Sequence, residues 1–151
     1  MRRRWSRRSA RWRSCDVSVA GTRPARYVLP RAARITDARD FKRVYARGTR
    51  ARGRWIVVVG LVRRQGGHRV GLSVAKEHGA AVRRNKIKRL LREAFRLERP
   101  TLPGAFDLVL IPVKNPAKLR LAELRAELVA LVTKLVDQAG RGARPAPRRR
   151  P

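Results

Sequence analysis

The pattern of apolar positions is clearest between Arg83 and Arg96. Apolar residues recur there at the i, i+3, i+4, i+7, i+8 spacing of a helix that packs on a core. These positions are Ile87, Leu90, Leu91, Ala94 and Phe95. Pro100 and then Pro103-Gly104 follow the stretch, and proline ends a helix because it has no backbone N–H. The pattern therefore predicts a helix with one buried face.

Two further helices are predicted. Thr36 or Asp37 can cap the start of a short one that ends near Gly48. Its apolar face is formed by Phe41, Val44 and Tyr45. A longer helix is expected to begin at the cap Asn115 and to end at Gly140. Its apolar stripe consists of Leu121, Leu124, Leu128, Leu131, Val132 and Leu135. Its near-balanced charge indicates a structural cover for a sheet.

Three strands are predicted. Residues 54–62 are β-branched and almost continuously apolar, which is typical of a central strand. Residues 68–76 alternate, with Val70, Leu72 and Val74 on one face and Gly71, Ser73 and Ala75 on the other. We predict that these two strands form an antiparallel hairpin. The small residues leave a shallow surface for a ligand or for a closely packed helix. Residues 106–113 form the third strand.

The composition changes the picture from a generic small domain to a protein that binds polyanions. The 151 residues include 40 Lys and Arg but only 10 Asp and Glu, a formal net charge of +30, and 43% of the residues are apolar. That length and apolar content suit one domain with a core, and such a charge attracts phosphate backbones. No run of 18 apolar residues and no signal-like segment occurs. We expect a cytoplasmic protein with no membrane partner.

The ends of the chain differ from the middle. Residues 1–28 contain nine Arg and no apolar period, so we predict a disordered basic extension, and residues 139–151 a disordered basic tail. The domain is assigned to residues 29–138. We interpret residues 1–27 as upstream sequence that is not translated, with the Val28 codon serving as the start. An arginine-rich arm that binds RNA is the alternative.

The polar side of the central helix carries stacked like charges. Within an arc of about 100° lie Asn85, Lys88, Arg89, Arg92, Arg96 and Arg99. Only Glu93 lies nearby with the opposite charge. Such stacking costs a few tenths of a kcal/mol per pair unless an anion neutralises it. A solvated face is the alternative, but this pattern favours a face that binds a polyanion, which we take to be nucleic acid.

The sequence contains no recognisable catalytic centre. The carboxylates are scattered, no glycine-rich phosphate loop occurs, and the single Cys15 has no Cys or His cluster with which to bind zinc. We predict turn or surface positions for His68 and His78. Any chemistry therefore belongs to a partner.

Several stretches resemble the protein subunit of bacterial ribonuclease P over about residues 29–135. The matching pieces are Leu29-Pro30, Arg39-Asp40-Phe41, residues 69–76 and, most specifically, residues 81–96. The resemblance implies an α+β fold, a small two-layer α/β sandwich whose helices pack on a mixed sheet. It also implies a left-handed βαβ crossover through the basic helix, whereas pattern alone predicts the right-handed form.

The resemblance further implies a protein without catalytic residues or metal ligands of its own. Such a subunit joins a catalytic RNA, assists the binding of magnesium and precursor tRNA, and supports removal of the 5′ leader. No further protein partner is required. The residues implied to meet the catalytic RNA are Arg84, Asn85, Lys88, Arg89, Arg92 and Arg96. Those implied to line a leader cleft between the first helix and the sheet are Phe41, Tyr45, Ser73 and Lys76.

The chain departs from the family pattern at Glu77, Ala80 and Val59, which concerns details of leader contact. A non-enzymatic RNA-binding protein, such as a ribosomal component or RNA chaperone, is the alternative function, because composition does not separate the two.

Overall fold

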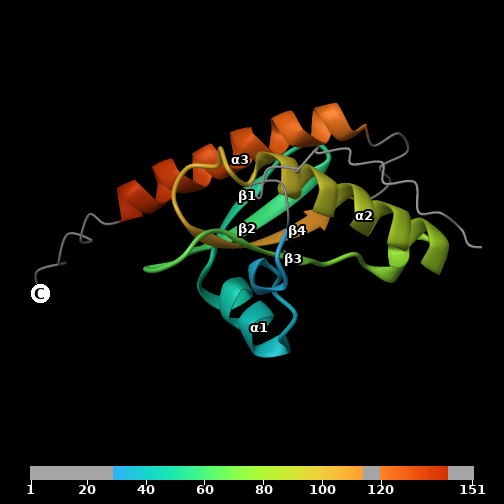
Figure 1. Cartoon of the computed structure of the whole chain (residues 1–151), viewed down its shortest axis with the longest axis horizontal. Helices are drawn as coiled ribbons and strands as arrows, with labels where there is room; N and C mark the ends of the chain where they lie inside the picture. Colours follow the sequence, from blue (N-terminus) through green and yellow to red (C-terminus); the bar gives the residue numbers. More distant parts are fainter. Residues whose placement is uncertain (1–28, 114–119, 143–151) are drawn as a thin grey trace, which may run out of the picture.

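The computed structural model describes residues 29–113 and 120–142, which form a four-stranded mixed sheet packed against helices (Figure 1). The strands are β1 (Thr49–Arg52), β2 (Ile56–Val62), β3 (Arg69–Leu72) and β4 (Phe106–Pro112). The α-helices are α1 (Ala38–Arg47), α2 (Ala81–Glu98) and α3 (Leu121–Gly142), and two short 3-10 turns are η2 (Arg31–Ala33) and η3 (Lys76–His78). The predicted α+β class and mixed sheet are confirmed.

The strand order is β1-β2-β4-β3, which differs from the order that the sequence suggested. β2 pairs with β4 in antiparallel orientation and β3 pairs with β4 in parallel. The predicted hairpin between residues 54–62 and 68–76 is therefore wrong. Its physical reason lies in β4, whose Leu108 and Val109 point to opposite faces and are both fully buried. A strand buried on both faces belongs in the middle of a sheet, and so it separates β2 from β3.

Strand β1 was missed by the sequence analysis. It pairs with β2 in antiparallel orientation and forms one edge of the sheet. Its four residues read Thr-Arg-Ala-Arg, and only Ala51 is buried. A strand with one small inward residue gives no apolar alternation to detect.

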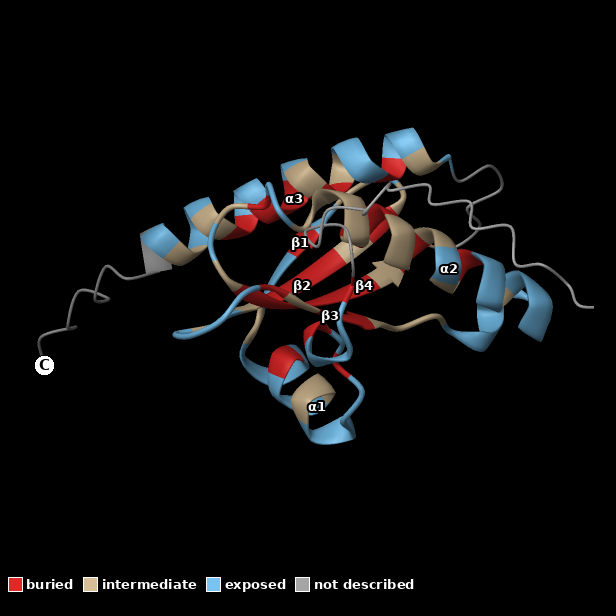
Figure 2. Ribbon diagram, in the orientation of Figure 1, coloured by how far each residue is buried: buried red, intermediate tan, exposed pale blue. Residues whose placement is uncertain are grey.

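The main core lies between one face of the sheet and the pair α2 and α3 (Figure 2). Strand residues Val58 and Leu110, the α2 residue Phe95 and the α3 residue Leu128 are all fully buried there. The apolar stripes predicted for both helices are thus confirmed as core. Helix α3 begins at Leu121, after the non-helical Arg120, so the start predicted at Asn115 is wrong, although Asn115 itself lies outside the described residues. The helix continues two residues past Gly140, where the sequence predicted its end.

Helix α1 packs on the opposite face of the sheet (Figure 1). As predicted, Asp37 caps its start by accepting a hydrogen bond from the Arg39 N–H at 2.8 Å, and Gly48 ends it. Val44 is fully buried in a small second core together with Val59. Helix α1 is therefore held on the sheet by a cluster separate from the main core.

The connection from β3 to β4 crosses over through α2, because these two strands are parallel neighbours. The implied βαβ unit is present, and its left-handed sense stays a prediction. The predicted disordered tail 139–151 is wrong at its start, because residues 139–142 continue α3. Residues 143–151 and the predicted basic extension 1–28 lie outside the described residues.

Candidate nucleic-acid interface

Helix α2 presents a row of cations to solvent. Its N-terminus has no side-chain cap at Ala80 and no acidic residue in the first turn. Buried residues on one side fix how the helix is rotated, so the polar side points away from the core. Four cations then follow one another at i, i+4 spacing, which corresponds to steps of about 6 Å. They are Arg84, Lys88, Arg92 and Arg96. We call them the α2 cation row.

Most of this positive charge has no carboxylate partner. Arg96 is the exception, because its Nε donates to the Glu93 carboxylate at 2.8 Å, and this hydrogen bond raises the pKa of Arg96. Arg84 donates to the backbone oxygen of Gly79 at 2.9 Å. Among the described residues, no carboxylate lies within ion-pair distance of Lys88 or Arg92. The row is thus largely unneutralised in the free protein.

The remaining two predicted RNA-facing residues lie beside this row. Asn85 and Arg89 are both exposed, one position after Arg84 and Lys88 respectively. All six predicted residues therefore lie on α2, Asn85 and Arg89 exposed and the four cations of the row half-buried. This side of the helix suits a negatively charged strand that runs along it.

The sheet face that carries α1 is organised in cross-strand rows that follow from the register. Gly71, Val109, Val59 and Arg50 form one row. The next row contains Ile111, Val57 and Arg52, and Ser73 continues it just beyond β3 by donating its N–H to Leu110 at 3.0 Å. We call this second set, Ser73, Ile111, Val57 and Arg52, the open row.

Helix α1 covers the first row. A Cβ atom placed on Gly71 would lie 2.7 Å from two ring atoms of Phe41, and one placed on Gly48 would lie 3.0 Å from Val59. Close packing of a helix therefore accounts for the glycine at position 71, one of the two explanations that the sequence left open. Phe41 is held between α1 and β3 and is only half-buried.

The open row is less covered. Val57 and Ile111 are half-buried, whereas Val59 is 1% exposed. Tyr45, the most exposed aromatic residue described, is 39% exposed. At about 100° per residue, Tyr45 lies on the flank of α1 opposite Arg43. Arg43 reaches back to Asp107, so Tyr45 lies on the flank towards the open row.

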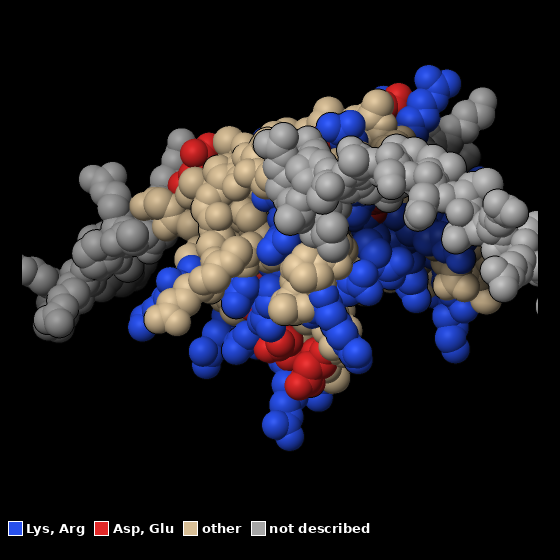
Figure 3. Space-filling model, in the orientation of Figure 1, with Lys and Arg blue, Asp and Glu red and all other residues tan. Residues whose placement is uncertain are grey.

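The predicted leader residues therefore gather around the open row. Ser73 belongs to it, Tyr45 flanks it, and Phe41 lies over the adjoining row. Lys76 is exposed and begins η3 three residues after Ser73. Figure 3 shows Lys and Arg spread around α1, with acidic atoms gathered at one place on this helix.

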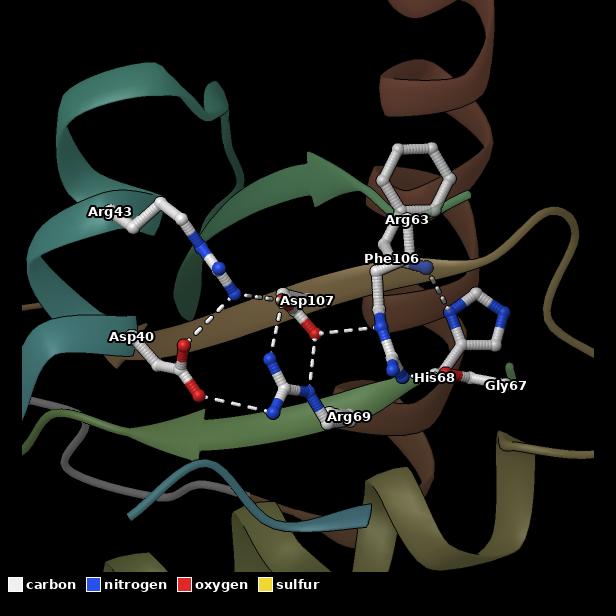
Figure 4. Close-up of polar contacts among 8 residues, drawn as sticks. All are labelled: Asp40, Arg43, Arg63, Gly67, His68, Arg69, Phe106 and Asp107. Carbon is white, nitrogen blue, oxygen red and sulfur yellow. Dashed lines mark hydrogen bonds and ion pairs between the residues drawn. The ribbon is translucent and has the colours of Figure 1, made fainter. Parts of the chain in front are cut away.

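An ion-pair network centred on Asp107 lies between α1 and the sheet (Figure 4). The Asp107 side chain is 2% exposed and accepts from Nε and Nη2 of Arg69, both at 2.7 Å. Arg63 lies 3.3 Å away and Arg43 of α1 3.4 Å away. Asp40 of α1 completes the network at 3.0 Å from Arg69. The network ties α1 to β3, to β4 and to the residue after β2.

The charges of the network stabilise one another. Burial alone would raise the pKa of the Asp107 carboxyl, but the hydrogen bonds and charge of Arg69, with the charges of Arg63 and Arg43, hold it below its usual value. The hydrogen bonds that Arg69 donates to Asp107 in turn raise the pKa of Arg69. Sequence analysis missed this network. A single Asp within the apolar run of β4 was the signal, because a buried charge needs a partner.

The two histidines are structural. His68 is 4% exposed, accepts at Nδ1 from the Phe106 N–H at 3.3 Å and contacts the Leu102 oxygen through Nε2 at 3.2 Å. Burial lowers the pKa of His68, so the ring is neutral at pH 7. His78 is 6% exposed, and its Nδ1 has no hydrogen-bond partner in the described part of the chain. Both residues lie in connecting segments, His68 just before β3 and His78 in η3, but they are buried there and not at the surface.

Two searches of the described residues gave negative results. They contain no group of three or more His, Cys, Asp or Glu side chains placed to hold a metal ion. None of their helices has the length and apolarity needed to cross a membrane.

Comparison with known proteins gives a consistent result. The family model described as Ribonuclease P matches residues 29–136. The ribonuclease P protein component of Desulfovibrio desulfuricans is 40% identical over 114 residues, which cover 73% of this chain and 88% of the relative. That of Desulforapulum autotrophicum is 34% identical over 114 residues, covering 76% of this chain and 97% of the relative.

Solved structures agree. The ribonuclease P protein of Thermotoga maritima superimposes with a TM-score of 0.61 at 30% identity, covering 67% of this chain and 96% of the other. That of Staphylococcus aureus gives a TM-score of 0.59 at 31% identity, covering 68% of this chain and 94% of the other. The residues matched by the family model include the sheet and the α2 cation row.

Proposed function

Because the chain belongs to the ribonuclease P protein family, we propose that it binds the catalytic RNA of that enzyme through α2 and the 5′ leader of precursor tRNA through the sheet face beside α1. The chain is a protein component of a ribonucleoprotein that processes tRNA. None of the findings favours a ribosomal component or an RNA chaperone.

The α2 cation row carries the first part of this proposal. Its cations Lys88 and Arg92 are half-buried and have no carboxylate partner in the described structure. In the free protein the stacked like charges repel one another. A bound polyanion would neutralise them and would therefore stabilise the complex. RNA phosphates are the ligand that matches the spacing and sign of the row. Asn85 adds a group that can both donate and accept a hydrogen bond.

The open row supports the second part. Single-stranded nucleic acid is bound by aromatic faces that stack on bases together with cations that follow the backbone. Phe41 and Tyr45 supply aromatic rings on one side, and Lys76 supplies a cation at the β3 end. Ser73 adds a hydroxyl between them. The leader is the unpaired part of precursor tRNA that suits such a surface.

We place the catalytic centre in the RNA partner, as the family resemblance implies, and the reaction in the cytoplasm. The donor set of the described residues does not fit a magnesium site of the protein's own, because no three His, Cys, Asp or Glu side chains converge. Magnesium is therefore assigned mainly to the RNA. The role of the protein is to position the two RNAs.

The decisive experiment measures cleavage of precursor tRNA by an in vitro transcribed bacterial ribonuclease P RNA at low magnesium, with and without this protein. We expect cleavage at the 5′ end of the mature tRNA only when the protein is present. Unchanged activity would reject the proposal. The leader contact is tested separately by Tyr45→Ala, which should weaken binding of precursor tRNA by about 1 to 3 kcal/mol and leave binding of mature tRNA unchanged. A uniform loss with a lower melting temperature would place Tyr45 in the fold alone.

A further inference from the structure

Strand β1 carries two arginines on the sheet face that holds α1. Ala51, between them, is 5% exposed and lies in the main core with α3. Because successive residues of a strand point to opposite faces, Arg50 and Arg52 point to the other face, and both are exposed. The burial of one alanine thus fixes the direction of two cations.

The register places Arg52 at the end of the open row. Arg52 pairs with Val57, and Val57 pairs with Ile111. Ser73 lies at the opposite end of the same row, beyond β3. Four strands at a spacing of about 4.8 Å put the two ends about 14 Å apart. The uncovered part of the sheet therefore runs from a hydroxyl and Lys76, across two half-buried apolar side chains, to an arginine.

Arg50 and Arg52 have no acidic partner in the part of the chain that the structure describes. No carboxylate of residues 29–113 and 120–142 lies within ion-pair distance of either side chain. Glu127 of α3, which reaches the β1–β2 turn, is engaged elsewhere because both its oxygens accept from the Trp55 N–H at 3.0 and 3.1 Å. The positive charge at this edge is available to a ligand.

A simpler explanation exists for charge on an edge strand. Exposed edges carry cations that discourage pairing with another chain. Edge protection requires charges on the strand. It does not require these charges to align with a less covered apolar row on the same face. The alignment of Arg52 with Val57 and Ile111, with Arg50 one row further, favours a ligand that crosses the sheet.

We propose that Arg50 and Arg52 bind phosphates of the upstream part of the precursor-tRNA leader, which crosses the open row from Ser73 towards β1. The proposal rests on the proposed function, since it extends the leader path from the β3 end to the opposite edge. Apolar Val57 and Ile111 contact the leader between the two ends. The nucleotides next to the cleavage site lie near Lys76 and α2, and those further upstream reach β1. Short leaders end before Arg52.

The test compares leaders of about two and about ten nucleotides on the same tRNA. Binding is measured to the complex of protein and catalytic RNA over a range of salt concentrations. The variant carries Arg50→Thr and Arg52→Thr, because threonine favours strands. The control variant carries Arg120→Gln and Lys134→Gln. Both cations are exposed, Arg120 just before α3 and Lys134 within it. Melting temperatures confirm that both variants fold.

For the long leader, loss of two phosphate contacts should lower the slope of log affinity against log salt by about 1.4. A fourfold rise in salt should then cost the parent about sevenfold more affinity than it costs the variant. With the short leader, the salt slope of the β1 variant should equal that of the parent. The salt slope of the control should equal that of the parent with both leaders. Equal slopes of variant and parent with the long leader would overturn the proposal.

The outcomes separate the two levels of inference. If the parent complex does not prefer precursor over mature tRNA, the proposed function fails. If it does, and Tyr45→Ala removes the preference while the β1 variant keeps the parent slope, only the β1 assignment fails. Self-association of the β1 variant in size-exclusion chromatography, together with unchanged leader binding, would assign these arginines to edge protection and overturn the proposal.

Discussion

At the scale of single residues, two contacts determine where α1 lies on the sheet. The Phe41 ring packs against the backbone of Gly71. Asp107 forms ion pairs with the guanidinium groups of Arg43 on α1 and of Arg69. The first contact is apolar and close, and the second is electrostatic. Because Phe41 adjoins the open row, both contacts also decide the position of the proposed leader surface.

Replacing Gly71 with alanine should displace α1. The added Cβ would lie 2.7 Å from the Phe41 ring and 3.3 Å from Ile35, so the ring must move. Overpacking of this kind lowers the free energy of unfolding by about 1 to 3 kcal/mol. Urea denaturation measures the loss, and binding of precursor tRNA should weaken with it. The double variant with Phe41→Leu should recover part of the stability, and no recovery would contradict a clash with Phe41.

The Asp107 network should make stability depend on pH in the acid range. The folded protein holds the pKa of Asp107 below its usual value of about 3.9, so the folded state binds this proton less readily than the unfolded state. The stabilisation is therefore complete above this value and is lost as the pH falls below it. Asp107→Asn leaves Arg69 with Asp40 as its remaining carboxylate partner and should cost about 3 kcal/mol at pH 7.

Denaturation curves of parent and Asp107→Asn at descending pH provide the measurement. The difference in unfolding free energy should be constant near neutrality and should shrink below about pH 4. Glu123→Gln, which removes an exposed carboxylate of α3, is the matched control and should change little at any pH. A constant difference down to pH 2 would show that the charge of Asp107 is not what stabilises the fold.

At the scale of elements, the sequence predicted what is encoded locally and failed where pairing partners decide. The apolar period and flanking prolines identified α2, and the cap Asp37 identified α1, because both signals lie within the helix itself. The central strand that pairs with β2 is β4, which lies more than forty positions further along the chain. Ile56, for example, pairs with Pro112. The mistaken hairpin came from assigning neighbours in sequence as neighbours in the sheet.

The candidate site divides in the same way. Family resemblance and helical period together named the exposed residues of α2, since one helix carries them all. The open row was not predicted, because Ser73, Val57 and Arg52 come from three segments that only the β4-centred register aligns. Strand β1 has no apolar alternation and was therefore not predicted. Its two arginines were for this reason not assigned to a strand.

The α2 cation row should control binding to the catalytic RNA. Arg89→Ala together with Arg92→Ala removes two cations from the polar side of α2, and the slope of log affinity against log salt should fall by about 1.4 to 1.8. Thermal stability should stay within about 0.5 kcal/mol, because neither side chain lies in the core. Filter binding over a salt series measures the slope. Lys134→Ala on α3 is the control, and a variant with the parent slope would show that these residues are merely solvated.

At the scale of the whole molecule, a formal net charge of +30 on 151 residues has opposite effects on folding and on binding. It destabilises the free folded protein and strengthens its binding to RNA. The free protein repels itself, and each phosphate that it contacts relieves part of that repulsion. Salt screens both interactions, since the Debye length falls to about 8 Å at physiological ionic strength. The same ions that stabilise the free fold therefore weaken its complex with RNA.

Raising potassium chloride from low to moderate concentration should increase the melting temperature of the free protein and decrease its affinity for the catalytic RNA. Scanning calorimetry and filter binding in the same buffers measure the two effects. Bound RNA should raise the melting temperature most at low salt, where affinity is greatest. A melting temperature of the free protein that falls with salt would contradict self-repulsion as a determinant of its stability.

The alternation of side chains in β1 has a consequence for how such proteins diverge between lineages. Ala51 is constrained by α3, whereas its neighbours Arg50 and Arg52 point to the other face and are exposed. Selection on folding and selection on the RNA substrate therefore act on alternate codons of one short segment. Substitutions at the outward positions can follow changes in the leaders of a genome without loss of stability, and the inward position should stay small while they vary.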